Sequence, residues 1–316
     1  MIRLGTRASL LARTQSQLVA DLITERMGVE VELVEVSTTG DRTAAPLSQL
    51  GGTGVFVSAL RDALLRGEVD VCVHSLKDLP TGPAAGVTLA AVPARADARD
   101  VLVARDGLTL GELPVGSKVG TGSPRRAAQL HALGLGLEIV DIRGNVDTRL
   151  RKVSEGEVDA VILARAGLDR IGRAAAVTET LDPLQMLPAP GQGALAVECR
   201  STDEVLAKDL CAALEDPHTR VAVDAERSLL ATLEAGCAAP VGALAEVVEG
   251  EDGDELWIRA VALSPDGTLS IRNSHTGLPH DAAGVGRQLA EDLLADGAAQ
   301  LIIMTHTEPP ARRQQA

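Results

Sequence analysis

The sequence predicts an α/β protein built from three domains. Segments with strand and helix periodicity alternate through the first two thirds of the 316 residues, as in a sheet covered by helices. The last third contains a helix, a run of strands and a final helix. At about 100–200 residues per domain, this length corresponds to two or three domains. We therefore expect two α/β units and a smaller α+β unit.

The first α/β unit begins with a strand at Ile2–Leu4 and a helix from about Ser9, a good N-cap residue. Further strands are expected at Val31–Val36 and Val69–Val73. An amphipathic helix through Phe56–Leu64 lies between them. Strands that alternate with helices predict a mostly parallel sheet.

The second α/β unit begins near Asp97. Its expected strands, each followed by a helical segment, are Lys118–Gly120, Glu138–Ile142 and Asp159–Ala164. The stretch Leu187–Gly193 is rich in Pro and Gly and leads to a strand, Ala194–Glu198, that is placed to return to the first unit. Ser201 and Glu204 form a capping-box pattern for the next helix.

The third unit begins near Asp216 with a helix that ends at Gly236, a residue suited to C′. A turn at Ser264–Gly267 separates the last two strands, and a helix runs from about Ala282 to Leu294. The expected strands are Gly242–Val248, Leu256–Leu263 and Leu269–Arg272. The expected domains are residues 1–95 with 194–215, residues 96–193 and residues 216–306, followed by a disordered tail, 307–316.

Composition narrows the classes of function. The net charge is −14 and aromatic residues make up 1%. An acidic chain repels nucleic acid and anionic membranes, and so few aromatics leave little base-stacking surface, so no nucleic-acid partner is expected. No apolar stretch is long enough to span a membrane and no signal-peptide pattern precedes the first strand. We therefore expect a cytoplasmic protein with no membrane partner.

The cysteines are far apart and form no CxxC pair, which predicts reduced thiols and no metal site. Cys72, Cys199 and Cys211 lie in or beside apolar strands and a helix and are expected to be buried. Cys237 lies in a loop of small residues, Glu234–Gly242, which would leave its thiol accessible. A buried small side chain is the alternative, and a helix C-terminus disfavours thiolate.

The segment Gly120–Arg126 has the features of an anion-binding turn. It follows a strand and opens a helix, with Ser123 suited to the N-cap and Pro124 to the first turn. Backbone N–H groups at such a helix end attract anions. Arg125 and Arg126 are unfavourable in a first turn, which indicates that an anion compensates them. A solvated surface pair is the alternative.

Two further turns share this design. In Ile142–Arg149 a strand ends, a glycine turn follows, Asn145 can cap the next helix and arginines flank the turn. Leu4–Ser9, near the N-terminus, carries Arg7. Ligands bind at the carboxyl ends of the strands in open α/β sheets, and Arg pairs bidentately with carboxylates. Together the three turns predict a site for a polycarboxylate or a phosphate.

The segment His74–Pro80 places a cation and a carboxylate side by side after a buried strand. Asp78 is a candidate acid/base group whose pKa would be set by neighbouring charges such as Lys77. A turn or capping role for Asp78 is the alternative.

Taken in order, these motifs resemble those of the porphobilinogen deaminase family. The segments that carry the resemblance are Gly5–Ser9, Thr39–Asp41, His74–Pro80, Gly120–Arg126, Arg143–Arg149, Leu163–Gly172, Leu187–Gly193 and Glu234–Gly242. The resemblance implies two lobes similar to those of periplasmic binding proteins, with mixed sheets and a cleft between them. It also implies a third, α+β domain that carries the cysteine.

The resemblance implies the chemistry as well. The family's cofactor is a dipyrromethane joined by a thioether to the loop cysteine, here Cys237. Porphobilinogen loses ammonia to give an azafulvene, four units are added one after another, and hydrolysis releases hydroxymethylbilane for tetrapyrrole (haem) synthesis. The family's carboxylate corresponds to Asp78, which would contact pyrrole N–H groups, assist ammonia departure and stabilise cationic intermediates.

The acetate and propionate groups of each pyrrole need cationic partners, and the resemblance implies them. The implied cofactor-binding residues are Cys237, Lys77, Asp78, Thr121, Ser123, Arg125 and Arg126. The implied substrate-binding residues are Arg7, Ser9, Arg143, Arg149 and Gln192. The family pattern implies a monomer and no metal ion.

One departure from the family pattern lies in the glycine-rich turn Gly51–Phe56. Family members often have a lysine in this turn, where this chain has Thr53. One carboxylate of the cofactor or substrate would then lack a cationic partner from this turn. Phe56 either lies over the site or packs on a helix face.

Two other functions fit parts of the sequence. A two-lobed binding protein for a small polycarboxylate would also use an arginine-lined cleft, but the unit that carries Cys237 argues against it. A phosphotransfer enzyme would use the glycine-rich turns, but the GxxxxGK[ST] motif is absent. The first would form no covalent adduct on Cys237, and the second would need Mg²⁺ and a nucleotide.

Overall fold

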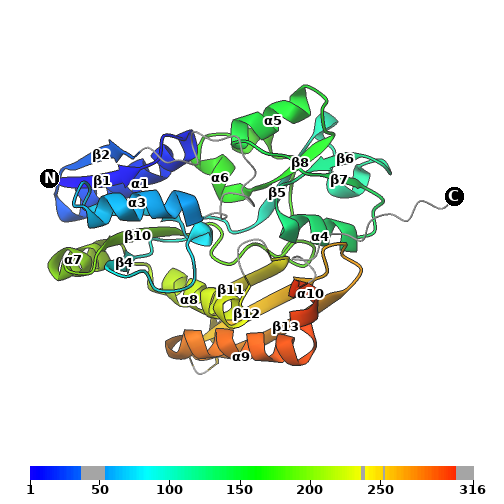
Figure 1. Cartoon of the computed structure of the whole chain (residues 1–316). Helices are drawn as coiled ribbons and strands as arrows, with labels where there is room; N and C mark the ends of the chain where they lie inside the picture. The colour runs from blue at the N-terminus through cyan, green and yellow to red at the C-terminus, as the bar shows by residue number, and fades with distance from the viewer. Residues whose placement is uncertain (37–53, 236–238, 252, 304–316) are drawn as a thin grey trace.

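The computed structural model describes residues 1–36, 54–235, 239–251 and 253–303. These residues form two five-stranded sheets and one three-stranded sheet, with helices packed against each (Figure 1). The expected fold class, two α/β lobes with mixed sheets and a smaller C-terminal α+β unit, is confirmed.

The first sheet has the strand order β2-β1-β3-β10-β4. Its strands are β1 (Ile2–Thr6), β2 (Val31–Glu35), β3 (Val71–Ser75), β4 (Val87–Ala91) and β10 (Leu195–Arg200). Strand β1 pairs in parallel with β2 and β3, whereas β10 runs antiparallel to β3 and β4. The segments around the sheet are α1 (Leu10–Met27), α3 (Gly54–Leu65), α7 (Glu204–Leu214) and the 3₁₀ turn η1 (Leu76–Asp78).

The second sheet repeats this pairing scheme, with the order β7-β6-β8-β5-β9. Its strands are β5 (Asp100–Ala104), β6 (Lys118–Gly120), β7 (Glu138–Val140), β8 (Ala160–Ala164) and β9 (Glu179–Thr180). Here β6 is parallel to β7 and β8, and β5 is antiparallel to β8 and β9. The helices are α4 (Pro124–Ala132), α5 (Val146–Ser154) and α6 (Arg165–Arg170), and the 3₁₀ turns are η2 (Arg105–Gly107), η3 (Leu110–Glu112) and η4 (Ala174–Ala176).

The chain crosses between these sheets twice. The first crossing, residues 92–99, joins β4 to β5, and the second, residues 181–194, joins β9 to β10. Each crossing leads into a strand that runs antiparallel to its neighbours in the receiving sheet. The expectation of mostly parallel sheets was therefore wrong, because β5 and β10 enter their sheets from the other lobe.

The third unit is an antiparallel sheet with helices against it. The strands are β11 (Val241–Gly250), β12 (Gly253–Leu263) and β13 (Ser270–Gly277), and the helices are α8 (Pro217–Thr232), α9 (Ala282–Ala295) and α10 (Ala298–Ile303), with the 3₁₀ turn η5 (Pro279–Asp281). Leu229, Ile258 and Leu289 lie in its aliphatic core. Trp257 on β12 is 38% exposed, and the guanidinium carbon of Arg259 lies 4.9 Å from its ring centroid.

A buried glutamate connects the third unit to both crossings. Glu226 on α8 is fully buried and accepts hydrogen bonds from the Nη1 and Nη2 atoms of Arg95 at 2.7 and 3.1 Å. Its carboxylate also accepts from the backbone N–H of Gly191 at 2.6 Å and of Ala245 at 2.8 Å. Because Arg95 and Gly191 belong to different crossings, one carboxylate holds both crossings against β11.

Several local predictions need correction. The N-cap of α7 is Asp203, and no side chain caps this helix, so the capping box from Ser201 does not form. Cys211 is exposed on α7, whereas Cys72 and Cys199 are buried as expected. Strands β4, β5 and β9 were not predicted. The predictions for the helix end at Gly236, for Thr39–Asp41, for Thr53, for the side chain of Phe56, for Cys237 and for the tail 307–316 lie outside the described residues.

Candidate active site

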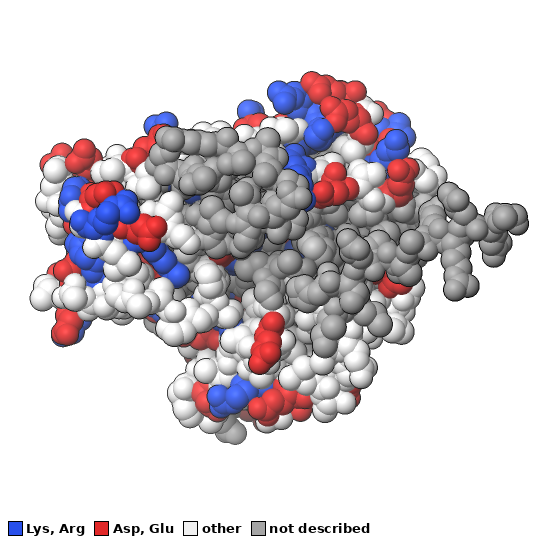
Figure 2. All heavy atoms as spheres, viewed as in Figure 1, with Lys and Arg blue, Asp and Glu red and all other residues white. Residues whose placement is uncertain are grey.

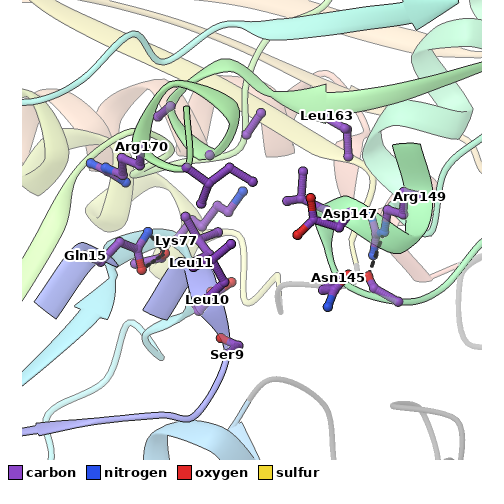
Figure 3. Close-up of a pocket in the computed structure, with 18 of the residues that line it drawn as sticks. Ser9, Leu10, Leu11, Gln15, Lys77, Asn145, Asp147, Arg149, Leu163 and Arg170 are labelled. Carbon is purple, nitrogen blue, oxygen red and sulfur yellow. Dashed lines mark hydrogen bonds between the residues drawn. The ribbon is translucent and has the colours of Figure 1, made fainter. Parts of the chain in front are cut away.

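A cavity of about 820 Å³ lies where the two five-stranded sheets face each other. Its walls come from the turns that follow β1, β3, β6, β7 and β8, at the carboxyl ends of these strands. In Figure 3 the start of α1 and the start of α5 lie on opposite sides of this space. Open α/β sheets bind ligands at this edge, so the cavity is the candidate site.

The lining of the cavity is strongly cationic. Among the described residues, six cations line it: Arg7, Lys77, Arg126, Arg143, Arg149 and Arg170. Two carboxylates, Asp78 and Asp147, oppose them. In contrast, acidic and basic side chains are mixed at the outer edges of the face in Figure 2, and the whole chain has a charge of −14. The cavity therefore favours a ligand with several negative charges.

The first wall is the turn between β1 and α1. Arg7 and Ser9 line the cavity, and the Ser9 Oγ also caps α1 by accepting from the Ala12 N–H at 3.4 Å. Gln15, one turn further along α1, donates from Nε2 to the Ser75 Oγ at 3.0 Å. This bond connects α1 to Ser75 at the end of β3, and Lys77 and Asp78 follow in the next turn.

Lys77 and Asp78 enter the cavity from η1, directly after β3. The Lys77 Nζ donates to the Gln192 Oε1 at 3.2 Å. Burial, together with the positive charge of Arg126, lowers the pKa of Lys77 to about 8, against the opposing effects of Asp78 and Asp100. Lys77 is therefore still a cation at neutral pH, and a carboxylate that binds beside it would favour its charged form further.

The turn into α4 carries Arg125 and Arg126, and its compensating anion is part of the chain. Asp100 Oδ2 accepts from the Arg125 Nη2 at 2.7 Å, and Asp100 Oδ1 accepts from the Arg126 Nη2 at 2.7 Å. Burial alone would raise the pKa of Asp100, but both guanidinium groups and the Gln192 amide hold it well below its usual range. An anion does compensate the two arginines, as predicted, but it is the carboxylate of Asp100 from the same chain.

The turn into α5 provides the opposite wall. The Asn145 side chain caps α5 by accepting from the Thr148 N–H at 2.9 Å. The Arg149 Nε donates to the Gly144 carbonyl at 2.9 Å, and this bond is dashed in Figure 3. Burial lowers the pKa of Arg149. Arg143, at the cavity's exposed rim, lies 3.3 Å from Asp141.

Four predicted site residues lie behind the cavity wall instead of in it. Arg125 donates to the Leu187 carbonyl and to Asp100, and Gln192 is buried between Lys77 and Asp100. Thr121 Oγ1 accepts from the Ser123 N–H at 3.2 Å, and Ser123 Oγ accepts from the Arg126 N–H at 3.5 Å. These side chains shape the turn that presents Arg126. Cys237 lies outside the described residues.

Sequence reasoning did not assign five polar residues of the lining to the site: Gln15, Ser75, Asn145, Asp147 and Arg170. Arg170 on α6 donates from Nη2 to the Gly193 carbonyl at 2.6 Å, and burial lowers its pKa. Arg170 is the last residue of α6, the helix that follows β8, so no turn motif of the kind that carries Arg7 marked it in the sequence. Gln15 was visible as a polar residue among the apolar positions of α1.

The described part of the chain contains neither a cluster of metal ligands nor a membrane-spanning helix. No group of three or more His, Cys, Asp and Glu residues is arranged to hold a metal ion within residues 1–36, 54–235, 239–251 and 253–303. In the same ranges, no helix combines the length and the apolar character needed to cross a bilayer.

Comparisons with known proteins agree along nearly the whole chain. Residues 2–208 match the family model described as "Porphobilinogen deaminase, dipyromethane cofactor binding domain", and residues 221–295 match "Porphobilinogen deaminase, C-terminal domain". The porphobilinogen deaminase of Nocardia farcinica is 57% identical over 98% of this chain and 91% of its own length. That of Mycobacterium tuberculosis is 58% identical over 96% of this chain and 98% of its own length.

A likeness to a solved structure is much weaker. A periplasmic substrate-binding protein of an ABC transporter from Coxiella burnetii is 17% identical, with a TM-score of 0.45 over 69% of this chain and 93% of that chain. The fold of this chain is therefore assigned from its own strand pairings.

The fold and the cavity define a two-lobed α/β protein with a cationic cleft for a polyanionic ligand. The family models and the relatives identify the family within this class of proteins. The chain belongs to the porphobilinogen deaminase family, and residues 2–208 match the model of that family's dipyrromethane cofactor-binding domain.

The residues of the cavity fit a dipyrromethane. Two pyrroles with an acetate and a propionate each carry four carboxylates in total, and six cations from the described segments line the space. Leu10, Leu11 and Leu163 add apolar surface against which flat rings can pack. A volume of about 820 Å³ lies within the usual range of small-molecule sites.

Proposed function

We propose that this chain is an enzyme, a hydroxymethylbilane synthase, that joins four porphobilinogen units head to tail on a dipyrromethane held by Cys237 through a thioether. It then releases hydroxymethylbilane by hydrolysis. When bound, the dipyrromethane supplies the nucleophilic terminal pyrrole carbon to which the first unit is joined. The observation that carries this proposal is the cavity that Asp78 lines together with six cations among the described residues.

Asp78 is the proposed catalytic residue. Its carboxylate accepts hydrogen bonds from pyrrole N–H groups and places a negative charge where the substrate becomes cationic as its C–N bond breaks and ammonia leaves. A new C–C bond then forms, and the attacked ring carbon loses a proton. Asp78 suits this task because it lines the cavity beside Lys77, at the carboxyl end of β3.

The cations are the proposed partners of the acetate and propionate groups. Lys77 and Arg126 are proposed to bind the cofactor, and Arg7, Arg143 and Arg149, with Ser9, to bind the substrate. Arg170 is an addition that the cavity lining supports. Arg125, Thr121, Ser123 and Gln192 are proposed to act by shaping the wall, because their bonds are made to neighbouring protein groups.

The test is the intact mass of the purified protein beside a Cys237→Ser variant. The expected result is an added mass of one dipyrrole on the wild type that the variant lacks. A second mass, taken after incubation with porphobilinogen, should show further pyrrole units on the wild type alone. A wild type that gains no adduct under either condition would contradict the proposal and favour the binding protein for a polycarboxylate.

Three further properties belong to this proposal. We propose that the enzyme acts as a monomer in the cytoplasm, without a nucleic-acid partner. Its domains are proposed to be residues 1–95 with 194–215, residues 96–193 and residues 216–306. Strand β10 pairs with β3 on one side and with β4 on the other, which supports assigning the segment after the second crossing to the first domain.

A further inference from the structure

Asp100 is a buried carboxylate at the junction of the two lobes. It is fully buried and is the first residue of β5, directly after the first crossing. Its Oδ1 accepts from the Arg126 Nη2 and Nε at 2.7 and 3.2 Å, and its Oδ2 accepts from the Arg125 Nη2 at 2.7 Å. One carboxylate therefore fixes both guanidinium groups at the start of α4.

Gln192 extends this arrangement to the other lobe. It is 1% exposed and lies on the second crossing. Its Nε2 donates to Asp100 Oδ1 at 2.8 Å and to the Ala98 carbonyl at 2.7 Å, while its Oε1 accepts from the Lys77 Nζ at 3.2 Å. An amide whose two ends bond to different lobes links Asp100 to Lys77.

Arg126 and Lys77 lie at the two ends of this series of hydrogen bonds, and both face the cavity. Arg126 has five N–H groups, and three of its bonds go to described residues: two to Asp100 and one, at 3.1 Å, to the Ile162 carbonyl. Both Arg126 and Lys77 line the cavity, whereas Asp100 and Gln192 do not. Two like charges from different lobes would separate without a carboxylate behind them.

We propose that Asp100 is a positioning residue, whose carboxylate holds Arg126 directly and Lys77 through Gln192, so that cations from both lobes meet the carboxylates of one ligand. The identity of that ligand, a pyrrole with acetate and propionate groups, rests on the proposed function. The charge arrangement itself does not depend on it.

The state of Lys77 reports whether this link operates. The charged groups that act on Lys77 are Arg126 and Arg125, which oppose its protonation, and Asp78 and Asp100, which favour it. Removing the charge of Asp100 should make Lys77 lose its proton at a lower pH. Replacing Gln192 should act in the same direction, because the ammonium loses an acceptor.

The chain makes this measurement simple because it contains four lysines, Lys77, Lys118, Lys152 and Lys208. In protein labelled with ¹³Cε-lysine, each gives one resonance whose shift follows protonation. The resonance that disappears in Lys77→Arg identifies Lys77. Without the cofactor, as in a Cys237→Ser background, it should titrate near pH 8. In the same background with Asp100→Asn it should titrate about one pH unit lower.

Two companion variants make the result decisive. Gln192→Met keeps Asp100 and both of its arginine pairs but removes the link, so it tests the proposal even if Asp100→Asn does not fold. It should lower the Lys77 titration and raise KM for porphobilinogen about tenfold, with a smaller change in kcat. Asp97→Asn, which removes an exposed partner of Arg99 on the same crossing, should change neither.

The outcomes separate the inference from the proposed function. If Lys77 titrates in folded Asp100→Asn and in Gln192→Met as it does in the wild type, the positioning role is overturned. If wild-type protein does not consume porphobilinogen, the proposed function fails, while the lysine titration still tests the link.

Discussion

At the scale of single residues, the sequence located charges in turns but not the partners of those charges. Arg7, Lys77 and Arg149 line the cavity where strands end, as the motif argument expected. Arg125 does not, because Asp100 satisfies it from 25 positions away in the chain. A local pattern shows that a charge is unusual for its position. It does not show whether the compensating group is a ligand or another part of the protein.

The two carboxylates of the cavity make Asp78 testable. Asp78→Asn keeps the shape of the side chain and removes its charge, so turnover of porphobilinogen should fall by about 10²-fold or more. The fold, followed by circular dichroism, and the dipyrrole adduct, followed by intact mass, should be retained. Asp147→Asn, from the same lining, should reduce turnover far less. Near-normal turnover in Asp78→Asn would exclude the catalytic role.

The pKa of Lys77 predicts a pH dependence with a definite sign. With its pKa lowered to about 8, Lys77 is a cation below that pH and becomes neutral above it. In the enzyme that carries the cofactor, the neighbouring carboxylates raise this pKa, so kcat/KM, which reports the free enzyme, should fall at a pH above 8 as one carboxylate partner is lost. Lys77→Arg keeps its charge, so its profile should lack this limb. Identical alkaline limbs in both proteins would assign the effect to another group.

The same lowered pKa affects stability in the opposite direction. The unfolded chain holds the Lys77 proton more tightly than the folded chain, so protonation costs stability. This cost is present in full below about pH 8 and is relieved as the pH rises from there toward the ordinary pKa of lysine. The site therefore gives up some stability in order to keep a cation ready for the ligand.

At the scale of elements, helix starts were predicted well where a side chain caps the helix, but a capping pattern in the sequence did not always correspond to a cap. Ser9, Ser123 and Asn145 each accept a hydrogen bond from the first turn of their helices. Ser201 matches the capping pattern, but α7 begins at Glu204, and its N-cap residue Asp203 makes no capping bond with its side chain. The pattern describes a bond that a side chain can make, and at Ser201 that bond is not made.

The cap of α5 should link stability to ligand binding. Asn145→Ala removes the bond to the Thr148 N–H, which should lower the free energy of unfolding by about 1 kcal/mol. It should also raise KM, because Arg149 lies on the loosened first turn. Asp216→Ala removes the equivalent bond to the Thr219 N–H of α8 and should cost similar stability without raising KM. Urea unfolding and steady-state kinetics on both variants provide the comparison.

At the scale of the whole molecule, the sequence predicted the units but not how the chain connects them. The class of each unit followed from its periodicity. The direction of β5 and β10 did not, because their pairing depends on crossings between the lobes. Glu226 and Arg95 were likewise missed, since a largely buried ion pair between distant segments leaves no local pattern.

The bonds of Glu226 predict a large effect on stability. Glu226→Gln leaves Arg95 buried without its counter-charge, which should lower the free energy of unfolding by about 3–5 kcal/mol. Glu68→Gln is the control, because the Arg66–Glu68 pair is exposed and such pairs contribute little. Urea unfolding compares the two variants. Equal midpoints would show that the carboxylate of Glu226 does not hold the crossings.

The lone tryptophan gives this chain an unusual optical property. With no tyrosine and a single tryptophan, nearly all of its intrinsic fluorescence comes from Trp257, on the three-stranded sheet. Emission therefore follows the unfolding of that sheet alone, whereas far-ultraviolet circular dichroism averages over every helix and strand. While Glu226 holds both crossings, the fluorescence and the circular dichroism should change together. A variant in which the two signals change separately is one in which the three-stranded sheet unfolds independently of the other two sheets.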